Sequence, residues 1–237
     1  MTFRSLDATH IIGTIERLSR RIAERFPGAG LSGVGRELHG LARECAQVTV
    51  RLSRPNWPVR LGVFAVIALM GAVVVAAVVG VVQRLQSVTQ ISGLSDFVQG
   101  VEAGVNDVVF LGVAVYFLVS IEARLKRRTA LRFMHQLRSI AHIVDMHQLT
   151  KDPEHLLSPR ENTASSPART LTRAELGRYL DYCSELLSLT GKIGALFAHS
   201  MDDTVVLQAV NEIEDLTNGL SRKIWQKITL LERVPAG

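Results

Sequence analysis

Apolar residues recur at every third or fourth position over most of this chain, a spacing that places them on one face of an α-helix. Such stripes cover residues 7–26, 31–52, 122–148, 172–197 and 206–231. No segment shows the strict alternation of apolar and polar residues that is typical of a half-buried strand. The pattern therefore predicts an all-α protein.

The stripes also predict which residues form the core. The expected core residues are Ile12, Ile15, Leu18, Ile22 and Phe26; Leu31, Val34, Leu38, Leu41, Cys45, Val48 and Leu52; Ala130, Met134, Leu137, Ala141 and Val144; Leu176, Leu180, Cys183, Leu187, Ile193 and Phe197; and Val206, Val210, Ile213, Leu216, Leu220, Ile224, Ile228 and Leu231. The second group follows a coiled-coil heptad pattern over three heptads. We expect the first two helices to form a hairpin or join a bundle. The alternative is that the basic first helix lies on a membrane surface.

A different pattern occupies Leu61–Val82, where 22 consecutive residues carry no charge. As a helix this segment is about 33 Å long, which matches the roughly 30 Å hydrocarbon core of a bilayer. A buried helix of a soluble protein is the alternative for such a run. A secretory signal is not expected, because 60 residues precede the segment and begin with a charged, periodic helix. The sequence predicts a retained transmembrane span.

The second apolar run, Val108–Ile121, has only 14 residues and would be about 21 Å long. It spans a bilayer if its helix begins earlier and carries Glu102, Asn106 and Asp107 into the outer leaflet. A re-entrant or interfacial segment is the alternative. We interpret the run as the second span of a hairpin, at about 100–121.

The distribution of charge predicts the orientation of this hairpin. Residues 1–60 contain ten Arg and five acidic residues, residues 84–107 contain one Arg and three acidic residues, and residues 122–151 contain seven Lys or Arg and two acidic residues. Because basic flanks stay in the cytosol, both termini are expected there, at the inner membrane if the source is bacterial. Anionic lipid headgroups, rather than nucleic acid, then account for the net charge of +5.

These patterns divide the chain into five segments. A cytoplasmic helical hairpin occupies 1–56, and the transmembrane hairpin occupies 57–121. A juxtamembrane cytoplasmic helix follows at 122–150, and a second cytoplasmic hairpin occupies 171–237. Between the juxtamembrane helix and the second cytoplasmic hairpin, residues 151–170 contain three prolines and many small polar residues and are expected to be a flexible linker.

The ends of the spans supply the expected contacts with the membrane interface. Trp57, which lies between two prolines, is the expected aromatic anchor. The expected basic contacts are Arg60, Lys126, Arg127 and Arg128.

Small residues recur every fourth position along the first span, where they form a ridge that allows another helix to approach closely. This ridge consists of Ala68, Ala72, Ala76 and Gly80. The partner would be the second span, another copy of the chain, or both. Near the outer end of the second span, Glu102 and Asn106 share one face, where they either line the mouth of an oligomeric pore or simply meet interfacial water.

The segment Ala141–His155 contains three His and three acidic residues, which raises the question of a metal site. His142 and His147 point about 140° apart on a helical wheel and cannot bind one ion while the helix is continuous. Only facing helices could assemble a site, from two pairs: His142 with Asp145, and His199 with Asp202 or Asp203. We expect a polar helix face, with no metal and no cofactor. Cys45 and Cys183 lack metal-site spacing and are expected to be reduced.

Two short motifs predict local structure. Gly28–Gly33 reads GxGxxG, but an Arg-rich helix rather than a strand precedes it, so we expect a turn and not a dinucleotide site. Thr172 and Glu175 have the spacing of a capping box at a helix start. No motif of a nucleophile, phosphate loop or zinc protease occurs in the sequence.

The function expected from these patterns is therefore non-enzymatic. The chain is predicted to be an oligomeric, two-pass membrane protein that binds an unidentified cytoplasmic protein through its helices. A small oligomeric ion channel is the first alternative, and a metal-dependent enzyme built on the helical bundle is the second.

Overall fold

The computed structural model describes residues 6–87, 94–153, 164–165 and 170–232; the side chains of residues 77, 81, 84–87, 94–105 and 107 lie outside this description. Every regular element in the described residues is an α-helix, so the all-α prediction is confirmed. Two helices are long and apolar enough to cross a membrane. Contacts divide the chain into two compact units, Met1–Arg54 with Arg127–Gly237, and Pro55–Lys126. Each unit is described by itself.

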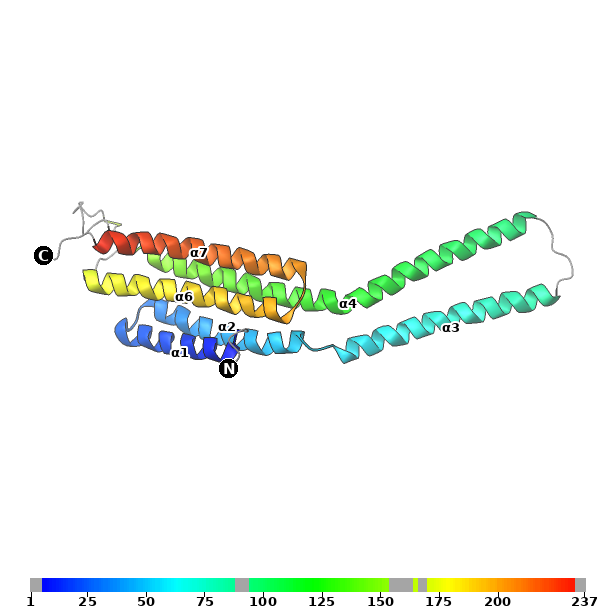
Figure 1. Cartoon of the computed structure of the whole chain (residues 1–237), viewed down its shortest axis with the longest axis horizontal. Helices are drawn as coiled ribbons and strands as arrows, with labels where there is room; N and C mark the ends of the chain where they lie inside the picture. The colour runs from blue at the N-terminus through cyan, green and yellow to red at the C-terminus, as the bar shows by residue number, and fades with distance from the viewer. Residues whose placement is uncertain (1–5, 88–93, 154–163, 166–169, 233–237) are drawn as a thin grey trace. The chain divides into compact units, whose positions relative to one another are not determined.

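The first unit is a bundle of α1 (Ala8–Arg25), α2 (Gly30–Leu52), the C-terminal part of α4 (Leu94–Leu149), α6 (Arg173–Ser200) and α7 (Thr204–Glu232) (Figure 1). Helix α6 is central, because it contacts α1, α2 and α7 and stacks Phe197 on Phe133 of α4, with the ring centroids 5.9 Å apart. Its buried residues cover more than one face, including Leu180 on one side and Tyr182 and Leu189 on the opposite side. The core of the bundle is therefore arranged around α6.

Side chains that cap the backbone begin two of these helices. Asp7 accepts a hydrogen bond from the Thr9 N–H (2.8 Å) at the start of α1. Thr172 accepts one from the Glu175 N–H, and the Glu175 carboxylate accepts one from the Thr172 N–H (2.8 Å), so the predicted capping box is confirmed. These bonds satisfy N–H groups that have no partner inside the helix.

The chain turns between α1 and α2 at Phe26–Ala29. Gly28 has φ of 80°, a backbone conformation that L side chains rarely adopt. Gly30 already begins α2, so the turn is shorter than the predicted Gly28–Gly33, and the last four of these six residues are helical. A helix precedes this turn in the structure, whereas the dinucleotide fingerprint requires a strand.

The predicted stripes form the core of the bundle. Almost all the expected residues are buried, and the exceptions are partly buried: Ile12, Val48, Leu216 and Ile228. Within the stripe of α1, Ile15, Leu18 and Ile22 have no exposed surface. The alternative that α1 lies on a membrane surface is therefore wrong, because α2 and α6 already cover its apolar face.

Two glycines of α2 allow close approach of neighbouring helices. A Cβ atom on Gly35 would lie 3.3 Å from the Ser19 Cα of α1, and one on Gly30 would lie within contact distance of the His147 ring of α4. The described part of the chain therefore packs α1 and α4 tightly against different positions of α2.

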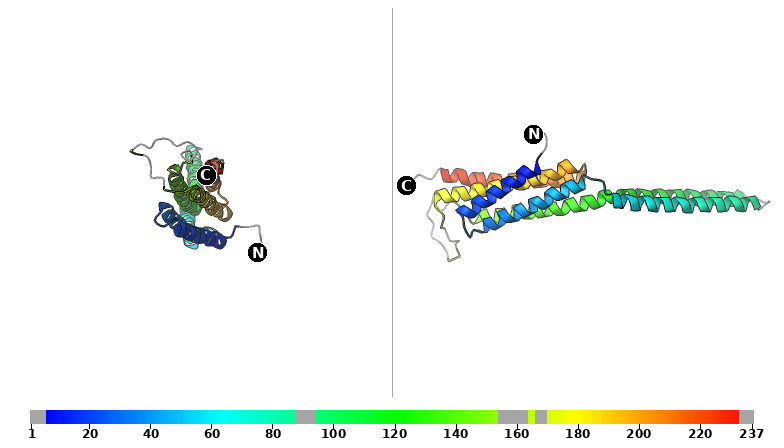
Figure 2. Two further views of the ribbon diagram at one scale, coloured as in Figure 1. Left: turned by 90° about the vertical axis from the view of Figure 1, so that its left-hand side faces the viewer. Right: turned by 90° about the horizontal axis from the view of Figure 1, so that it is seen from below.

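The second unit consists of α3 (Trp57–Ser87) and the first part of α4, which run in opposite directions (Figures 1 and 2). On α3 the half-buried residues are Val59, Val63, Ile67, Met70 and Gly80. The large apolar side chains of this unit that are more than half exposed are Trp57, Leu61, Phe64, Leu69, Val73, Val75, Val78, Val108, Val109, Phe110, Val113, Tyr116, Phe117 and Val119. A helix that is apolar around most of its circumference needs either a protein core or lipid around it.

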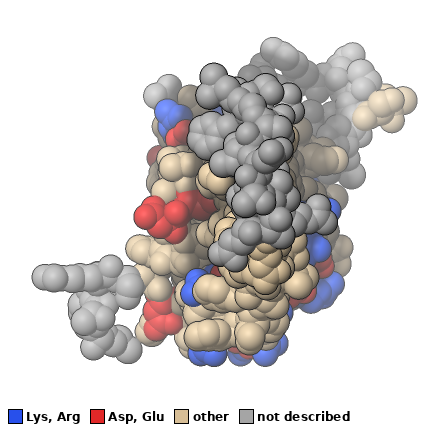
Figure 3. Space-filling model, turned by 90° about the vertical axis from the view of Figure 1, so that its right-hand side faces the viewer, with Lys and Arg blue, Asp and Glu red and all other residues tan. Residues whose placement is uncertain are grey.

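Charged side chains of both signs lie among uncharged groups on the face shown in Figure 3. The net charge of +5 is therefore not gathered into one continuous basic surface on this face.

Candidate functional site

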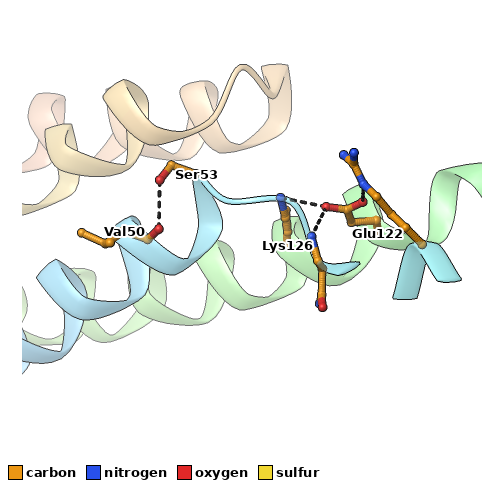
Figure 4. Close-up of polar contacts among 6 residues, drawn as sticks. Val50, Ser53, Glu122 and Lys126 are labelled. Atoms are coloured by element: carbon orange, nitrogen blue, oxygen red, sulfur yellow. Dashed lines mark hydrogen bonds and ion pairs between the residues drawn. The ribbon is translucent and has the colours of Figure 1, made fainter. Parts of the chain in front are cut away.

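Glu122 is the centre of a polar cluster in the second unit. Its Oε1 accepts a hydrogen bond from the Asn56 backbone N–H (2.9 Å), and its Oε2 accepts one from Arg60 Nε (2.7 Å) (Figure 4). The Lys126 ammonium, one helical turn further along α4, lies 3.0 Å from Oε1. The carboxylate therefore joins the beginning of α3 to α4 through two donors, Asn56 and Arg60, while Lys126 contacts it from within α4.

The donors also change the ionisation of Glu122. The hydrogen bond from Arg60, the backbone N–H of Asn56 and the nearby Lys126 together lower the pKa of Glu122 to about 2, although burial acts in the opposite direction. Only 14% of the side chain is exposed, whereas Arg60 is 49% exposed. A hydrogen bond to a charged group stabilises a fold by about 1.5–3 kcal/mol, and solvent around Arg60 reduces its share.

The contact between Arg60 and Glu122 has a consequence for the flanking charges. It places the beginning of α3 and the basic segment that starts at Arg124 at the same end of the second unit. Arg124 extends over the Phe117 ring, with its guanidinium carbon 4.1 Å from the ring centroid. Trp57 is 65% exposed at the same end of α3. Exposed aromatic and basic side chains at one end of an apolar helix pair are typical of a membrane interface.

Arg127 forms a separate ion pair within the bundle. Its Nε donates to both oxygens of Asp203, at 2.8 and 3.1 Å. Asp203 also accepts hydrogen bonds from the backbone N–H groups of Val205 and Val206, which begin α7. Burial raises the pKa of Asp203, but the hydrogen bonds from Arg127 and from the backbone outweigh it, so the net pKa is lowered. Arg127 is therefore an internal contact of the bundle, while Arg128 is exposed.

The His and Asp pairs considered for a metal do not meet. The described residues contain no group of three His, Cys, Asp or Glu that is arranged to bind an ion. Asp145 accepts a hydrogen bond from Gln148 (2.6 Å), and Asp203 is held by Arg127. His142 and His199 are exposed. Residues 154–155 of the segment Ala141–His155 lie outside the described residues.

The two thiols belong to the core. Burial raises the pKa of Cys45 to about 12 and that of Cys183 to about 12. A thiol with such a pKa is protonated at neutral pH and is a poor nucleophile and metal ligand.

The small-residue ridge of α3 faces away from α4 in the second unit. Ala68, Ala72 and Ala76 are exposed, and only Gly80 is half-buried. Of the two residues considered for a pore mouth, Asn106 is exposed, while the side chain of Glu102 lies outside the description.

The sequence alone did not indicate the contacts that Glu122 and Asp203 make. One local signal for Glu122 was present, because a Glu four residues before Lys126 is a helical ion-pair spacing. Its contacts with Asn56 and Arg60 had no such signal.

Comparisons with protein-family models, with curated proteins and with solved structures found no match to this chain.

Proposed function

We propose that the protein is a membrane-anchored interaction or signalling module without enzymatic activity, which assembles into homo-oligomers and binds a cytoplasmic protein through its bundle. The supporting observation is the exposed apolar surface of α3 and of the first part of α4, where Phe64, Phe110 and Tyr116 are each at least 67% exposed. Such a surface is unfavourable in water over this length and favourable in a hydrocarbon layer.

The interior of the bundle supports a structural rather than a catalytic role for its core. Its buried residues are aliphatic and aromatic with few exceptions. The buried hydroxyls of Thr49, Thr190 and Thr217 each donate to a carbonyl of their own helix. These hydroxyls are satisfied locally and are not held toward a common point, as reacting groups would be.

The proposed orientation places both termini in the cytosol, because the basic segments around Arg60 and Arg124 lie at one end of the second unit. Anionic headgroups would contact exposed cations such as Arg128, with each contributing about 1 kcal/mol near the surface. In bacteria this membrane would be the inner membrane.

Cysteine labelling tests this topology. In a chain whose native cysteines are replaced, Ser92→Cys should react with a membrane-impermeant thiol reagent in intact cells, while Ser166→Cys should react only after lysis. Carbonate extraction should leave both variants in the membrane pellet. Labelling of Ser166→Cys in intact cells would reverse the orientation, and release by carbonate would exclude the anchor.

The proposed assembly uses the small-residue ridge, which is exposed on a single chain and is therefore available to another copy. Ala72→Leu with Ala76→Leu should lower the mass measured in mild detergent, because the added side chains prevent close approach of helices. Val78→Leu, on a different side of α3, is the matched control and should leave the mass unchanged. Equal masses for all three proteins would show that the ridge does not assemble the oligomer.

A small pore is the second candidate, because Val109, Val113 and Phe117 lie on one exposed face of α4. In an oligomer this face would line an apolar path that closes by dewetting. Arg124 over Phe117 argues against a cation-selective path, since it would place positive charge at the inner end. Val113→Ser should increase ion leak through liposomes if a pore exists. Tight liposomes with both wild type and Val113→Ser would leave only the interaction module.

A further inference from the structure

One face of the bundle carries a groove between α2 and α4, which lie side by side (Figure 2). Its floor is apolar, with Leu41 and Ile140, and Ile143 is 41% exposed at its edge. Nothing lies within 4 Å of the point where a Cβ atom of Gly40 would be, so the α2 side of the groove is open. The groove has room for the side chains of an approaching helix.

Acidic and basic side chains occupy different parts of this face, the acidic ones on α2 and the basic ones on α4. Glu37 and Glu44, seven residues apart on α2, line the groove. Arg128 and Arg132 are exposed on α4. None of the ion pairs among the described residues involves any of these four side chains. An acidic groove therefore borders a basic ridge on the same surface, which is a self-complementary arrangement.

The register of the two helices determines which charges can meet. Helix α2 runs antiparallel to α4, and Gly30 lies against His147 (Figure 1). Counting equally along both helices from this contact places Glu44 level with Phe133, one residue from Arg132. In a dimer whose two-fold axis is parallel to the helices, each residue of one chain lies at the same height along the axis as the same residue of the other chain. Glu44 of one copy is then level with Arg132 of the other.

We propose that this face is the interface between two copies of the chain, with the exposed ridge of α4 from each copy seated in the α2–α4 groove of the other. This inference rests on the homo-oligomer of the proposed function and identifies the surface of the bundle through which two chains would bind each other. Each contact occurs twice in such an isologous pair. The Glu44 carboxylate of one copy pairs with the Arg132 guanidinium of the second copy, Ile143 and Met146 supply apolar contact, and Ser139 lies near the axis.

The self-complementary charge favours a second copy over a foreign helix. A partner protein would have to supply both a basic stripe and an acidic groove, whereas a second copy already has both at the same level. The exposed apolar residues at this surface, Ile143 and Met146 (67% exposed), would also be covered in both copies at once.

Disulfide cross-linking of the full chain in native membranes tests the interface. Ser139→Cys should give a covalent dimer under mild oxidation with copper phenanthroline, because the same residue of both copies lies near the axis. Wild type and Asn218→Cys, an exposed position on α7, are the controls and should remain monomeric on gels. Absence of the Ser139→Cys dimer, or its cross-linking to a different protein only, would overturn the proposal.

Charge reversal in the Ser139→Cys chain provides the second arm. Glu44→Arg and Arg132→Glu should each lower the rate of cross-linking about tenfold by placing like charges together, and the two combined should restore it. Restoration would also show that a chain carrying both substitutions folds, so neither substitution is by itself incompatible with the fold. A native mass in detergent that is dimeric and unaffected by Glu44→Arg would refute this surface while the proposed oligomer stands, whereas a monomeric wild type would refute both.

Discussion

The close approach of α1 and α2 at Gly35 leads to a quantitative prediction. A Cβ atom at this position would lie 3.1 Å from Ser19 Oγ and 3.3 Å from Ser19 Cα. The nearer atom can rotate away, but the Cα belongs to the backbone of α1, so the helix itself must move. Gly35→Ala should therefore strain the packing of α1 on α2.

The expected size follows from two opposing effects. Replacing Gly by Ala inside a helix is favourable by about 0.5–1 kcal/mol, and this gain applies to Gly35 and to Gly40. Overpacking a tight contact costs about 1–3 kcal/mol and applies only to Gly35. At Gly40 nothing lies within 4 Å of the added atom. Gly40→Ala should therefore stabilise the bundle, and Gly35→Ala should destabilise it by up to about 2 kcal/mol.

Thermal unfolding of the full chain in detergent, followed by far-ultraviolet circular dichroism, measures this difference. For a chain of this size about 1 kcal/mol changes Tm by about 2–4 °C, so the two variants should differ by several degrees and in opposite directions from wild type. The rate at which the buried Cys45 thiol of α2 reacts should rise with Gly35→Ala. Equal stabilisation by both variants would show that α1 and α2 do not approach as closely as described.

Three further predictions concern single side chains. Glu122→Gln should lower the free energy of unfolding at pH 7 by about 1–3 kcal/mol. Because the pKa of Glu122 in the folded chain, about 2, lies below the ordinary 4.5, this contribution is complete above pH 4.5 and is lost as the pH falls towards 2. Unfolding temperatures of wild type and variant that remain different at low pH would contradict this reasoning. Cys45 and Cys183 should resist a thiol reagent at pH 7 until the bundle unfolds, and fast reaction of the native protein would show that they are not buried. Thr172→Ala should cost about 1 kcal/mol by removing the cap of α6, and an unchanged Tm would exclude that role.

Local patterns in the sequence were enough to predict the helices, most of the core and the capping box. Stripes such as Ile15–Leu18–Ile22 depend only on the 3.6-residue repeat of a helix, which is a property of the backbone. The capping box of Thr172 and Glu175 is equally local, since its bonds connect residues three positions apart. The length of an apolar run likewise predicts a helix long enough to cross a bilayer without reference to any other segment.

Tertiary structure was needed for every contact between distant segments. Arg60 and Glu122 are 62 residues apart, and Arg127 and Asp203 are 76 apart, so no spacing rule relates them. The sequence defined the small-residue ridge around Ala72 but not its direction, and the structure shows that it faces away from α4. Periodicity determines that a helix has an apolar face, whereas the partner of that face depends on how all the helices pack together, a choice made by the summed packing energy of the folded chain.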